Sequence, residues 1–251
     1  MLELIGVCRA FGGARAVDDV SLRVAGGRIT GLIGPNGAGK TTLFNLIAGS
    51  LPPSAGRILL NGQNIAGAPA HRRLGAGLAR TFQIPRPFGA MTVLENVLLA
   101  APGQRGEAPF ANWFLPRAVA AQERRNADRA RDILAFLALD RLAAAPAATL
   151  SGGQRKLLEL ARVLMADPKL ILLDEPAAGV NPTLLETIID RIAALHARGL
   201  TFLIVEHNLD LIARLCSEVH VMAAGKLLVS GTPEAVTRDA RVVDAYLGGA
   251  A

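Results

Sequence analysis

The sequence predicts an α/β protein with a mostly parallel core sheet, an N-terminal antiparallel β layer and an inserted helical subdomain. A Gly-rich turn near residue 40 joins a short apolar strand to a helix. From residue 151 onward, near-continuous apolar strands alternate with helical segments, as a parallel sheet covered on both faces requires. Between these two parts, prolines and a long helical pattern interrupt the alternation.

The first sixty residues are predicted to form strands and turns. Strand-like runs cover 2–7, 20–24 and 57–62, and Gly-Gly pairs at 12–13 and 26–27 separate them. Such spacing is typical of antiparallel strands joined by turns. We therefore predict a β layer beside the core.

The first strand and helix of the core lie on either side of a Gly-rich turn. The run 29-ITGLI-33 is apolar and β-branched, and helical periodicity follows over 40–49. We predict Gly49 as the C-cap of this helix, and Pro52 and Pro53 stand just beyond it. The predicted order is strand, loop, helix.

Residues 84–150 differ in character from the rest of the chain. Five prolines punctuate the first half: Pro85, Pro87, Pro102, Pro109 and Pro116. A helical pattern then covers about 117–139. We predict a single domain over 1–251, in which 84–150 is a helical subdomain and 1–83 with 151–251 form the core and β layer.

The C-terminal part is predicted to alternate helix and strand and to end in a hairpin and a helix. The predicted segments are helices over 153–166, 182–197 and 208–216, strands over 169–174 and 201–206, and a hairpin followed by a helix over 219–236. The last helix would have Thr232 at its N-cap and Pro233 at its first position.

Composition predicts a globular chain, with 51% hydrophobic and 19% charged residues. No apolar run reaches the 18 residues that a membrane span needs, and residues 1–13 lack the pattern of a secretion signal. We expect a soluble chain in the cytoplasm. Cys8 and Cys216 are far apart and show no metal spacing, so we interpret both as small buried hydrophobic residues.

The formal net charge of +6 raises the question of nucleic acid or anionic lipid as a partner. The basic residues are scattered, and the densest stretch, 122–132, interleaves acidic residues at helical spacing. That spacing is typical of a solvated helix face, and we expect no nucleic-acid partner.

The stretch 34-GPNGAGKT-41 matches the pattern GxxxxGK[ST] between a strand and a helix, which predicts a P-loop NTPase. Backbone N–H groups of such a loop converge on phosphate oxygens. Lys40 would reach the outer phosphates, and the Thr41 hydroxyl would bind Mg²⁺. The residues expected to hold the nucleotide here are Asn36, Gly37, Ala38, Gly39, Lys40, Thr41 and Thr42.

A second candidate group ends the strand 170-LILLDE-175. At the carboxyl edge of a parallel sheet, Asp174 would hold Mg²⁺ through water and Glu175 would polarise the attacking water. The alternative is that two acidic residues and a proline simply end a strand in solvent.

Three isolated residues join this candidate site. His207 follows the next apolar strand and should project from the same edge, although a lone histidine is commonly a surface or hydrogen-bonded residue. Gln83 leaves an apolar stretch where the insertion starts. Phe11 could stack on a nucleotide base or belong to the core. We predict catalytic roles for Glu175, His207 and Gln83, and metal ligation by Thr41, Gln83 and Asp174.

A second phosphate cradle is predicted where a helix starts. Ser151, Gly152, Gly153 and Gln154 would offer N–H groups and a helix dipole to an anion. This helix leads directly into the strand of Asp174, so both should approach one edge of the sheet. We expect the inserted subdomain to displace the helix start sideways, which leaves the second cradle without a phosphate of its own.

These motifs, in this order, resemble the nucleotide-binding subunit of ABC transporters over essentially the whole chain. The resemblance implies a head-to-tail pair of subunits, copies or paralogues, each holding ATP between its own GPNGAGKT loop and the LSGGQ of the other. It also implies that the helical subdomain and the segment after Gln83 contact transmembrane permease subunits. The chain would then lie peripherally on the cytoplasmic face of the inner membrane, and a periplasmic or extracellular binding protein would be an indirect partner.

Finer strings resemble the ATP-binding subunit of branched-chain amino acid importers. They are 80-RTFQ-83, 91-MTVLENVLLA-100, 174-DEPAAGVNP-182, 205-VEHNLDLI-212 and 244-DAYLG-248. The resemblance implies an extended loop at 101–118, which would contact a membrane subunit or pack internally as an insertion. The expected function is to bind and hydrolyse Mg-ATP for import of branched-chain or other hydrophobic amino acids. The alternatives are a urea, amide or lipopolysaccharide transporter and a soluble ABC protein that acts on ribosomes or DNA.

Overall fold

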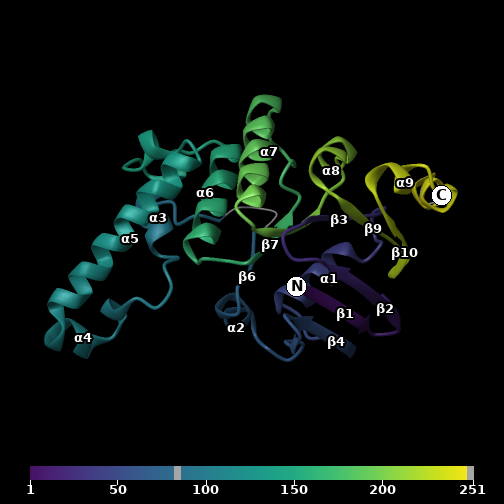
Figure 1. Ribbon diagram of the computed structural model, residues 1–251, viewed down its shortest axis with the longest axis horizontal. Helices are drawn as coiled ribbons and strands as arrows, with labels where there is room; N and C mark the ends of the chain where they lie inside the picture. The colour runs from purple at the N-terminus through teal and green to yellow at the C-terminus, as the bar shows by residue number, and fades with distance from the viewer. Residues whose placement is uncertain (82–85, 248–251) are drawn as a thin grey trace. The chain divides into compact units, whose positions relative to one another are not determined.

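The computed structural model describes residues 1–81 and 86–247 (Figure 1). The chain forms two compact units. The first unit comprises 1–83, 168–178 and 192–251, and the second comprises 84–167 and 179–191. The predicted subdomain boundary between residues 150 and 151 stays a prediction.

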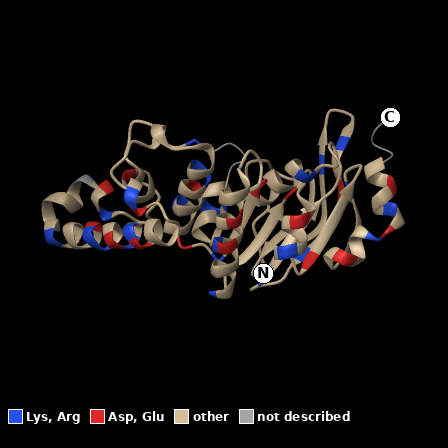
Figure 2. Ribbon diagram, turned by 90° about the horizontal axis from the view of Figure 1, so that it is seen from above, with Lys and Arg blue, Asp and Glu red and all other residues tan. Residues whose placement is uncertain are grey.

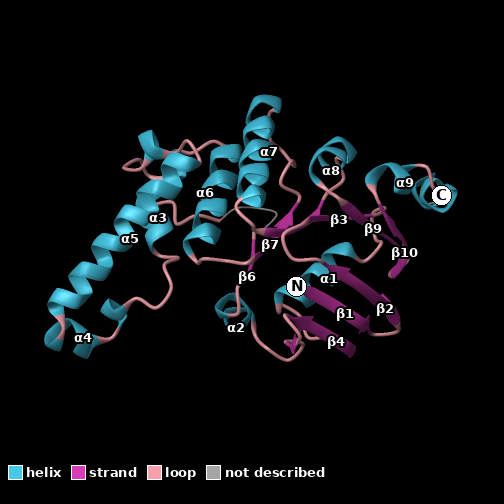
Figure 3. Cartoon of the chain, viewed as in Figure 1, coloured by secondary structure: helices cyan, strands magenta, loops and turns pink. Residues whose placement is uncertain are grey.

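An antiparallel sheet of the first unit has the strand order β2-β1-β4-β5 (Figure 3). The strands are β1 (Leu2–Phe11), β2 (Ala14–Val24), β4 (Ala55–Leu60) and β5 (Gln63–Asn64). The predicted N-terminal antiparallel layer is therefore confirmed. β2 begins ahead of the predicted run 20–24 because its first half pairs with the end of β1 through register shifts.

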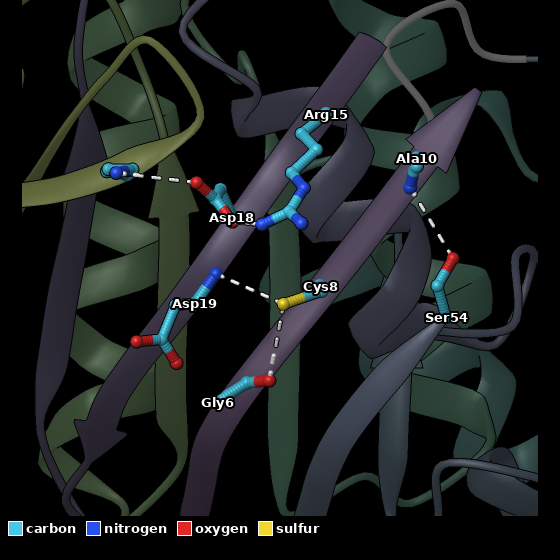
Figure 4. A network of polar contacts seen from close by, with 8 residues as sticks. Gly6, Cys8, Ala10, Arg15, Asp18, Asp19 and Ser54 are labelled. Atoms are coloured by element: carbon cyan, nitrogen blue, oxygen red, sulfur yellow. Dashed lines mark hydrogen bonds and ion pairs between the residues drawn. The ribbon is translucent and has the colours of Figure 1, made fainter. Parts of the chain in front are cut away.

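A polar network holds the bulged part of the β1–β2 pair (Figure 4). The backbone N–H of Asp19, whose φ is 53°, donates to the Cys8 Sγ over 3.2 Å. Asp18 is paired with Arg15 at 2.7 Å and with Lys226 at 3.4 Å. The hydrogen bond from Arg15 lowers the pKa of the Asp18 carboxyl, with smaller contributions from Lys226. The network ties β2 to Lys226, which begins a strand near the C-terminal end of the same unit.

The second sheet of the first unit has the order β10-β9-β3-β8-β7-β6. All neighbours from β9 to β6 run parallel, and only β10 is antiparallel to β9. The strands are β3 (Ile29–Ile33), β6 (Leu78–Arg80), β7 (Leu170–Asp174), β8 (Thr201–Val205), β9 (Glu218–Ala223) and β10 (Lys226–Gly231). The predicted mostly parallel core sheet is confirmed.

The register of this sheet aligns the ends of three strands. Leu32 of β3 and Asp174 of β7 both pair with Val205 of β8. The loops that leave these strands therefore emerge side by side at one edge, where ligands of parallel sheets bind.

The main core of the first unit lies around α1 (Lys40–Ala48). Its side chains Leu43, Phe44, Leu46 and Ile47 are fully buried and belong to one cluster with residues of both sheets. The remaining helices that lie entirely in this unit are α2 (Ala70–Gly75), α8 (Leu209–Leu215), α9 (Pro233–Thr237) and α10 (Ala240–Leu247). As predicted, Thr232 caps α9, and its hydroxyl accepts a hydrogen bond from Ala235 N–H over 3.3 Å.

The second unit is helical over its described residues. It contains α3 (Val93–Leu98), α4 (Pro109–Phe114), α5 (Pro116–Phe136) and α6 (Gly152–Met165), with short 3₁₀ turns between them. The predicted helix over 117–139 ends earlier, because Ala138 adopts a positive φ of 56°. Basic and acidic residues alternate along α5 as the spacing indicated (Figure 2). Helix α7 (Pro182–Ala197) begins in this unit and ends in the first.

Across residues 1–81 and 86–247, no helix has both the length and the apolarity that crossing a bilayer requires. Cys216 is buried as expected, and desolvation raises the pKa of its thiol to about 12. Cys8 is only half-buried, because its sulfur takes part in the polar network at the bulge.

Candidate functional site

The Gly-rich loop follows β3 and leads into α1. Gly39 is the N-cap of this helix, with a φ of 94°, and a Cβ there would lie 2.3 Å from the Ala16 carbonyl oxygen. A Cβ on Gly34 would lie 2.1 Å from the carbonyl oxygen of Met222. Both glycines are required by close backbone approach, so the fold itself demands them at these two positions.

Lys40 is the first residue of α1 and is buried. Its Nζ donates to the carbonyl oxygens of Gly34 over 2.7 Å and Pro35 over 2.9 Å. Burial lowers the pKa of the Lys40 ammonium, and the negative charge of Glu175 opposes that change. The loop therefore holds a partly desolvated cation among its own carbonyls, where an anion would interact with it strongly.

The β9–β10 turn supports the loop from a distant part of the sequence. The N–H of Gly225 donates to the Ala38 carbonyl over 3.1 Å, and the Gly225 carbonyl accepts from Asp18 N–H over 2.8 Å. Tyr246 on α10 also lies beside the loop. Burial raises the pKa of the Tyr246 hydroxyl, and a hydrogen bond with the Gly34 backbone opposes this rise. None of these supports was predicted from sequence.

Asp174, Glu175 and His207 lie together at the aligned strand ends. Asp174 is the last residue of β7 and is 6% exposed. Glu175 follows with a left-handed φ of 48°, a strained conformation that is enriched at functional sites. Its Oε1 lies 3.3 Å from the Nε2 of His207. The structure thus brings together the acidic pair and the histidine that sequence spacing singled out.

Sequence reasoning missed Glu206, which is 3% exposed and directly precedes His207. Its carboxylate accepts from three backbone N–H groups: Ala177 over 2.6 Å, His207 over 2.8 Å and Asn208 over 3.1 Å. Glu206 therefore fixes the loops that carry Glu175 and His207. The only sequence signal was an acidic residue that ends an apolar strand.

A second missed residue is Arg80, the last residue of β6. Its guanidinium pairs with the Asp174 carboxylate at 2.8 Å. The partners are 94 positions apart in the sequence, and only the β6–β7 pairing brings them together.

Phe11 and Gln83 have different outcomes. Phe11 ends β1 and is 47% exposed, with the Arg9 guanidinium 4.8 Å from its ring centre, so the alternative of a core position is wrong. Its exposed ring is accessible for stacking, which stays a prediction. Gln83 lies outside the residues that the structure describes.

The second predicted cradle starts α6 in the helical unit. The Ser151 hydroxyl accepts from the backbone N–H of Gln154 over 3.3 Å, and the side-chain Oε1 of Gln154 accepts from the backbone N–H of Ser151 over 2.9 Å. Together these bonds form a capping box. A Cβ on Gly153 would meet Leu184 Cδ2 at 1.9 Å, whereas a Cβ on Gly152 would meet nothing within 4 Å. Packing in this unit therefore accounts for Gly153 but not for Gly152.

The donors fit an ion that keeps most of its own water. Among the described residues, no three His, Cys, Asp or Glu side chains gather in a way that could hold a metal. The donors available from the predicted set are the Asp174 carboxylate and the exposed Thr41 hydroxyl. A small number of protein oxygen ligands is typical of Mg²⁺ sites in which phosphates and water supply the remaining ligands.

A family model described as "ABC transporter" matches residues 17–178, more than half of the chain. The chain belongs to the ABC transporter family. A second family model, "Branched-chain amino acid ATP-binding cassette transporter", matches residues 226–251 of this ABC protein.

Several ABC proteins resemble the chain over nearly its whole length. The probable branched-chain amino acid transport ATP-binding protein LivG of Archaeoglobus fulgidus is 40% identical to this chain. The alignment covers 99% of this chain and 95% of that protein. The high-affinity branched-chain amino acid transport ATP-binding protein LivG of Escherichia coli K12 is 37% identical. The alignment covers 99% of this chain and 98% of that protein. A crystal structure of an ABC transporter cassette in its ADP conformation has a TM-score of 0.84 and 37% identity, with 99% of this chain and 98% of that chain covered.

Proposed function

We propose that this chain binds and hydrolyses Mg-ATP and thereby energises an ABC importer of branched-chain amino acids. The observation that carries the proposal is the alignment of β3, β7 and β8, which places the Gly-rich loop beside the pair of Glu175 and His207. Family membership and the likeness to a cassette in its ADP conformation support the same activity.

Each group at this edge has a chemical role in the proposal. Backbone N–H groups of the loop and the Lys40 ammonium bind the phosphates. Thr41, Asp174 and Gln83 would hold Mg²⁺, which would supply positive charge beside the phosphates. Glu175 polarises the attacking water. His207 orients Glu175 through their contact at 3.3 Å. The exposed Phe11 ring stacks on the base.

The branched-chain cargo rests on two supports. The C-terminal segment matches a branched-chain family model, and both relatives described above are named for branched-chain amino acid transport. These names favour amino acids over urea, amides or lipopolysaccharide, and they favour a transporter over a soluble protein of ribosomes or DNA. The cargo itself is bound by other subunits.

We infer that the site is completed by a second ATPase subunit. Gly152 supports this inference, because no packing in its own unit excludes a side chain there. A phosphate held by another subunit would exclude one, since the backbone must approach it closely. A head-to-tail pair is self-complementary, so both composite sites form together.

The helical unit is the proposed contact with transmembrane permease subunits on the cytoplasmic face of the inner membrane. Three aromatic residues of the 101–118 segment are strongly exposed: Phe110 at 78%, Trp113 at 87% and Phe114 at 75%. The alternative prediction, that this segment packs internally, is therefore wrong for these three aromatic side chains. An exposed apolar surface of this kind is typical of a protein interface.

The test is Glu175→Gln, which keeps the shape of the side chain and removes its charge. ATP binding should persist while hydrolysis slows by about a hundredfold or more, and an ATP-bound dimer should accumulate. Glu107→Gln, an exposed acidic residue of the helical unit, is the matched control. Phosphate release and sedimentation measure the two effects. Hydrolysis by Glu175→Gln at the wild-type rate would remove Glu175 from its role.

A further inference from the structure

Arg80 places a guanidinium between helix α1 and the end of strand β7. One of its terminal nitrogens donates to the Asp174 carboxylate over 2.8 Å, and the other donates to the side-chain oxygen of Asn45 on α1. The guanidinium carbon also lies 5.1 Å from the ring centre of Phe44, the neighbour of Asn45. Three contacts on two elements therefore hold this charge in one orientation.

The pair of Arg80 and Asp174 is almost completely withdrawn from solvent. The exposed fractions of the two side chains are 13% and 5%. Water screens such a pair weakly, so each charge strongly affects any third charge that comes near. The Asp174 carboxylate is thus already neutralised by a cation of the chain itself.

The residue after Arg80 holds the backbone of the same aspartate. The Asp174 N–H donates to the Thr81 hydroxyl over 3.3 Å, and Thr81 N–H donates to the Leu172 carbonyl over 2.9 Å. Two consecutive residues, one at the end of β6 and one just after it, therefore orient both the charge and the backbone of Asp174. The placement of Asp174 therefore depends on β6 as well as on its own strand.

We propose that Arg80 is the resident counter-ion of Asp174 and makes divalent-cation binding at this edge depend on a bound nucleoside polyphosphate. This inference rests on the proposed role of Asp174 in holding Mg²⁺. A doubly charged ion at Asp174 would share the carboxylate with Arg80, and the positive charge of Arg80 would repel the ion. The phosphates of a nucleotide add the negative charge that outweighs this repulsion. Arg80 is a positioning residue that acts through Asp174.

The experiment titrates each full-length protein with Mn²⁺ alone and follows the free ion by electron paramagnetic resonance. Arg80→Met and Arg80→Gln remove the charge, and Arg80→Lys keeps it. The exposed Arg57→Met is a matched control. Circular dichroism and urea unfolding show that each variant folds.

Without nucleotide, both neutral variants should bind Mn²⁺ on the order of tenfold more tightly than the wild type, as expected when one charge is removed several ångströms from a doubly charged ion. Arg80→Lys and Arg57→Met should bind Mn²⁺ as the wild type does. A purely structural role predicts the opposite sign, because a displaced Asp174 would bind the ion more weakly. Unchanged or weaker binding by the neutral variants overturns the proposal.

Two further measurements separate the possible failures. If Asp174→Asn binds Mn²⁺ in the presence of ADP as the wild type does, the proposed metal role of Asp174 fails. If Asp174→Asn loses that binding while the neutral Arg80 variants match the wild type, the Arg80 inference alone fails. If neither neutral variant folds, Mn²⁺ binding by the wild type, measured with and without ADP, still tests the proposal. Binding of Mn²⁺ to Asp174 that is equally tight with and without ADP overturns the proposal.

Discussion

Gly152 and Gly153 are adjacent in the sequence but differ in what surrounds them. Gly153→Ala should lower the free energy of unfolding by about 1 kcal/mol, because the half-buried Leu184 side chain, whose Cδ2 would lie 1.9 Å from the new Cβ, must move away. Gly152→Ala should leave stability within about 0.5 kcal/mol, since its Cβ meets no neighbour. The same change should weaken ATP-driven pairing of subunits. Urea unfolding and sedimentation measure the two effects, and wild-type pairing of Gly152→Ala would contradict the proposed use of this glycine.

Glu206 offers a second prediction at the residue scale. Glu206→Gln replaces one carboxylate oxygen with an amide NH₂, which would face either the N–H of Ala177 or the N–H groups of His207 and Asn208. Donors would then face donors in a buried site, so we expect a loss of about 1–3 kcal/mol in the free energy of unfolding. ATP hydrolysis should fall as well, because the loops of Glu175 and His207 lose their common anchor. Glu107→Gln is again the exposed control, and equal urea midpoints for the two variants would contradict this account.

At the scale of elements, α1 is fixed at both ends by groups from other parts of the chain. Its N-terminus leaves the Gly-rich loop, which the Gly225 turn supports. At its C-terminus the buried Arg73 donates to the carbonyls of Leu46 over 2.6 Å and Ile47 over 2.7 Å. Positive charge at a helix C-terminus is favourable, although burial lowers the pKa of the Arg73 guanidinium. Helix α1 can therefore present its N–H groups to phosphates with little reorganisation.

Helix α4 carries its aromatic side chains on one face. Phe110, Trp113 and Phe114 follow the i, i+3, i+4 spacing, while Asn112 on the other side donates to the Gly106 carbonyl over 2.8 Å. The chain thus holds the helix in place and leaves the aromatic face exposed. Such a face is an expected contact of the proposed permease complex.

Trp113 is the only tryptophan, so its fluorescence reports this face directly. In the isolated chain its emission should be that of a solvent-exposed indole, open to iodide quenching. Assembly with the permease subunits should shift the emission to the blue and reduce quenching. Phe110→Ala with Phe114→Ala should leave the free energy of unfolding within about 0.5 kcal/mol and weaken assembly. An unchanged Trp113 spectrum in the assembled transporter would place the contact elsewhere.

At the scale of the whole molecule, the Gly-rich loop and the Ser151 cradle belong to different compact units. Ser151→Arg should leave nucleotide binding by an isolated subunit nearly unchanged, because the loop around Lys40 is untouched. It should block ATP-driven pairing, since in the proposed pair a bulky cation would stand where the other subunit presents the terminal phosphate of its ATP. Equal pairing of the variant and the wild type in sedimentation would contradict the shared site.

The sequence by itself determined the fold class and the motifs. Apolar runs of strand length between helical periods were enough to predict the parallel sheet, because burial on both faces leaves that pattern in the local composition. The spacing from strand to polar residue also predicted that Glu175 and His207 would lie at the same edge of the sheet, and the structure adds their contact at 3.3 Å. Helix α3 was missed, although its cap residues Thr92 and Glu95 form a capping box that the sequence displays.

Only the tertiary structure decided which distant groups support the site. Arg80 and Asp174, or Gly225 and Ala38, are paired by strand register and loop packing across long sequence separations. No local pattern encodes such a pair, because each partner is an ordinary residue until folding brings them into contact. Likewise, Gly152 and Gly153 are indistinguishable in the sequence, and only the position of Leu184 shows that a side chain would meet a close neighbour at Gly153 and none at Gly152.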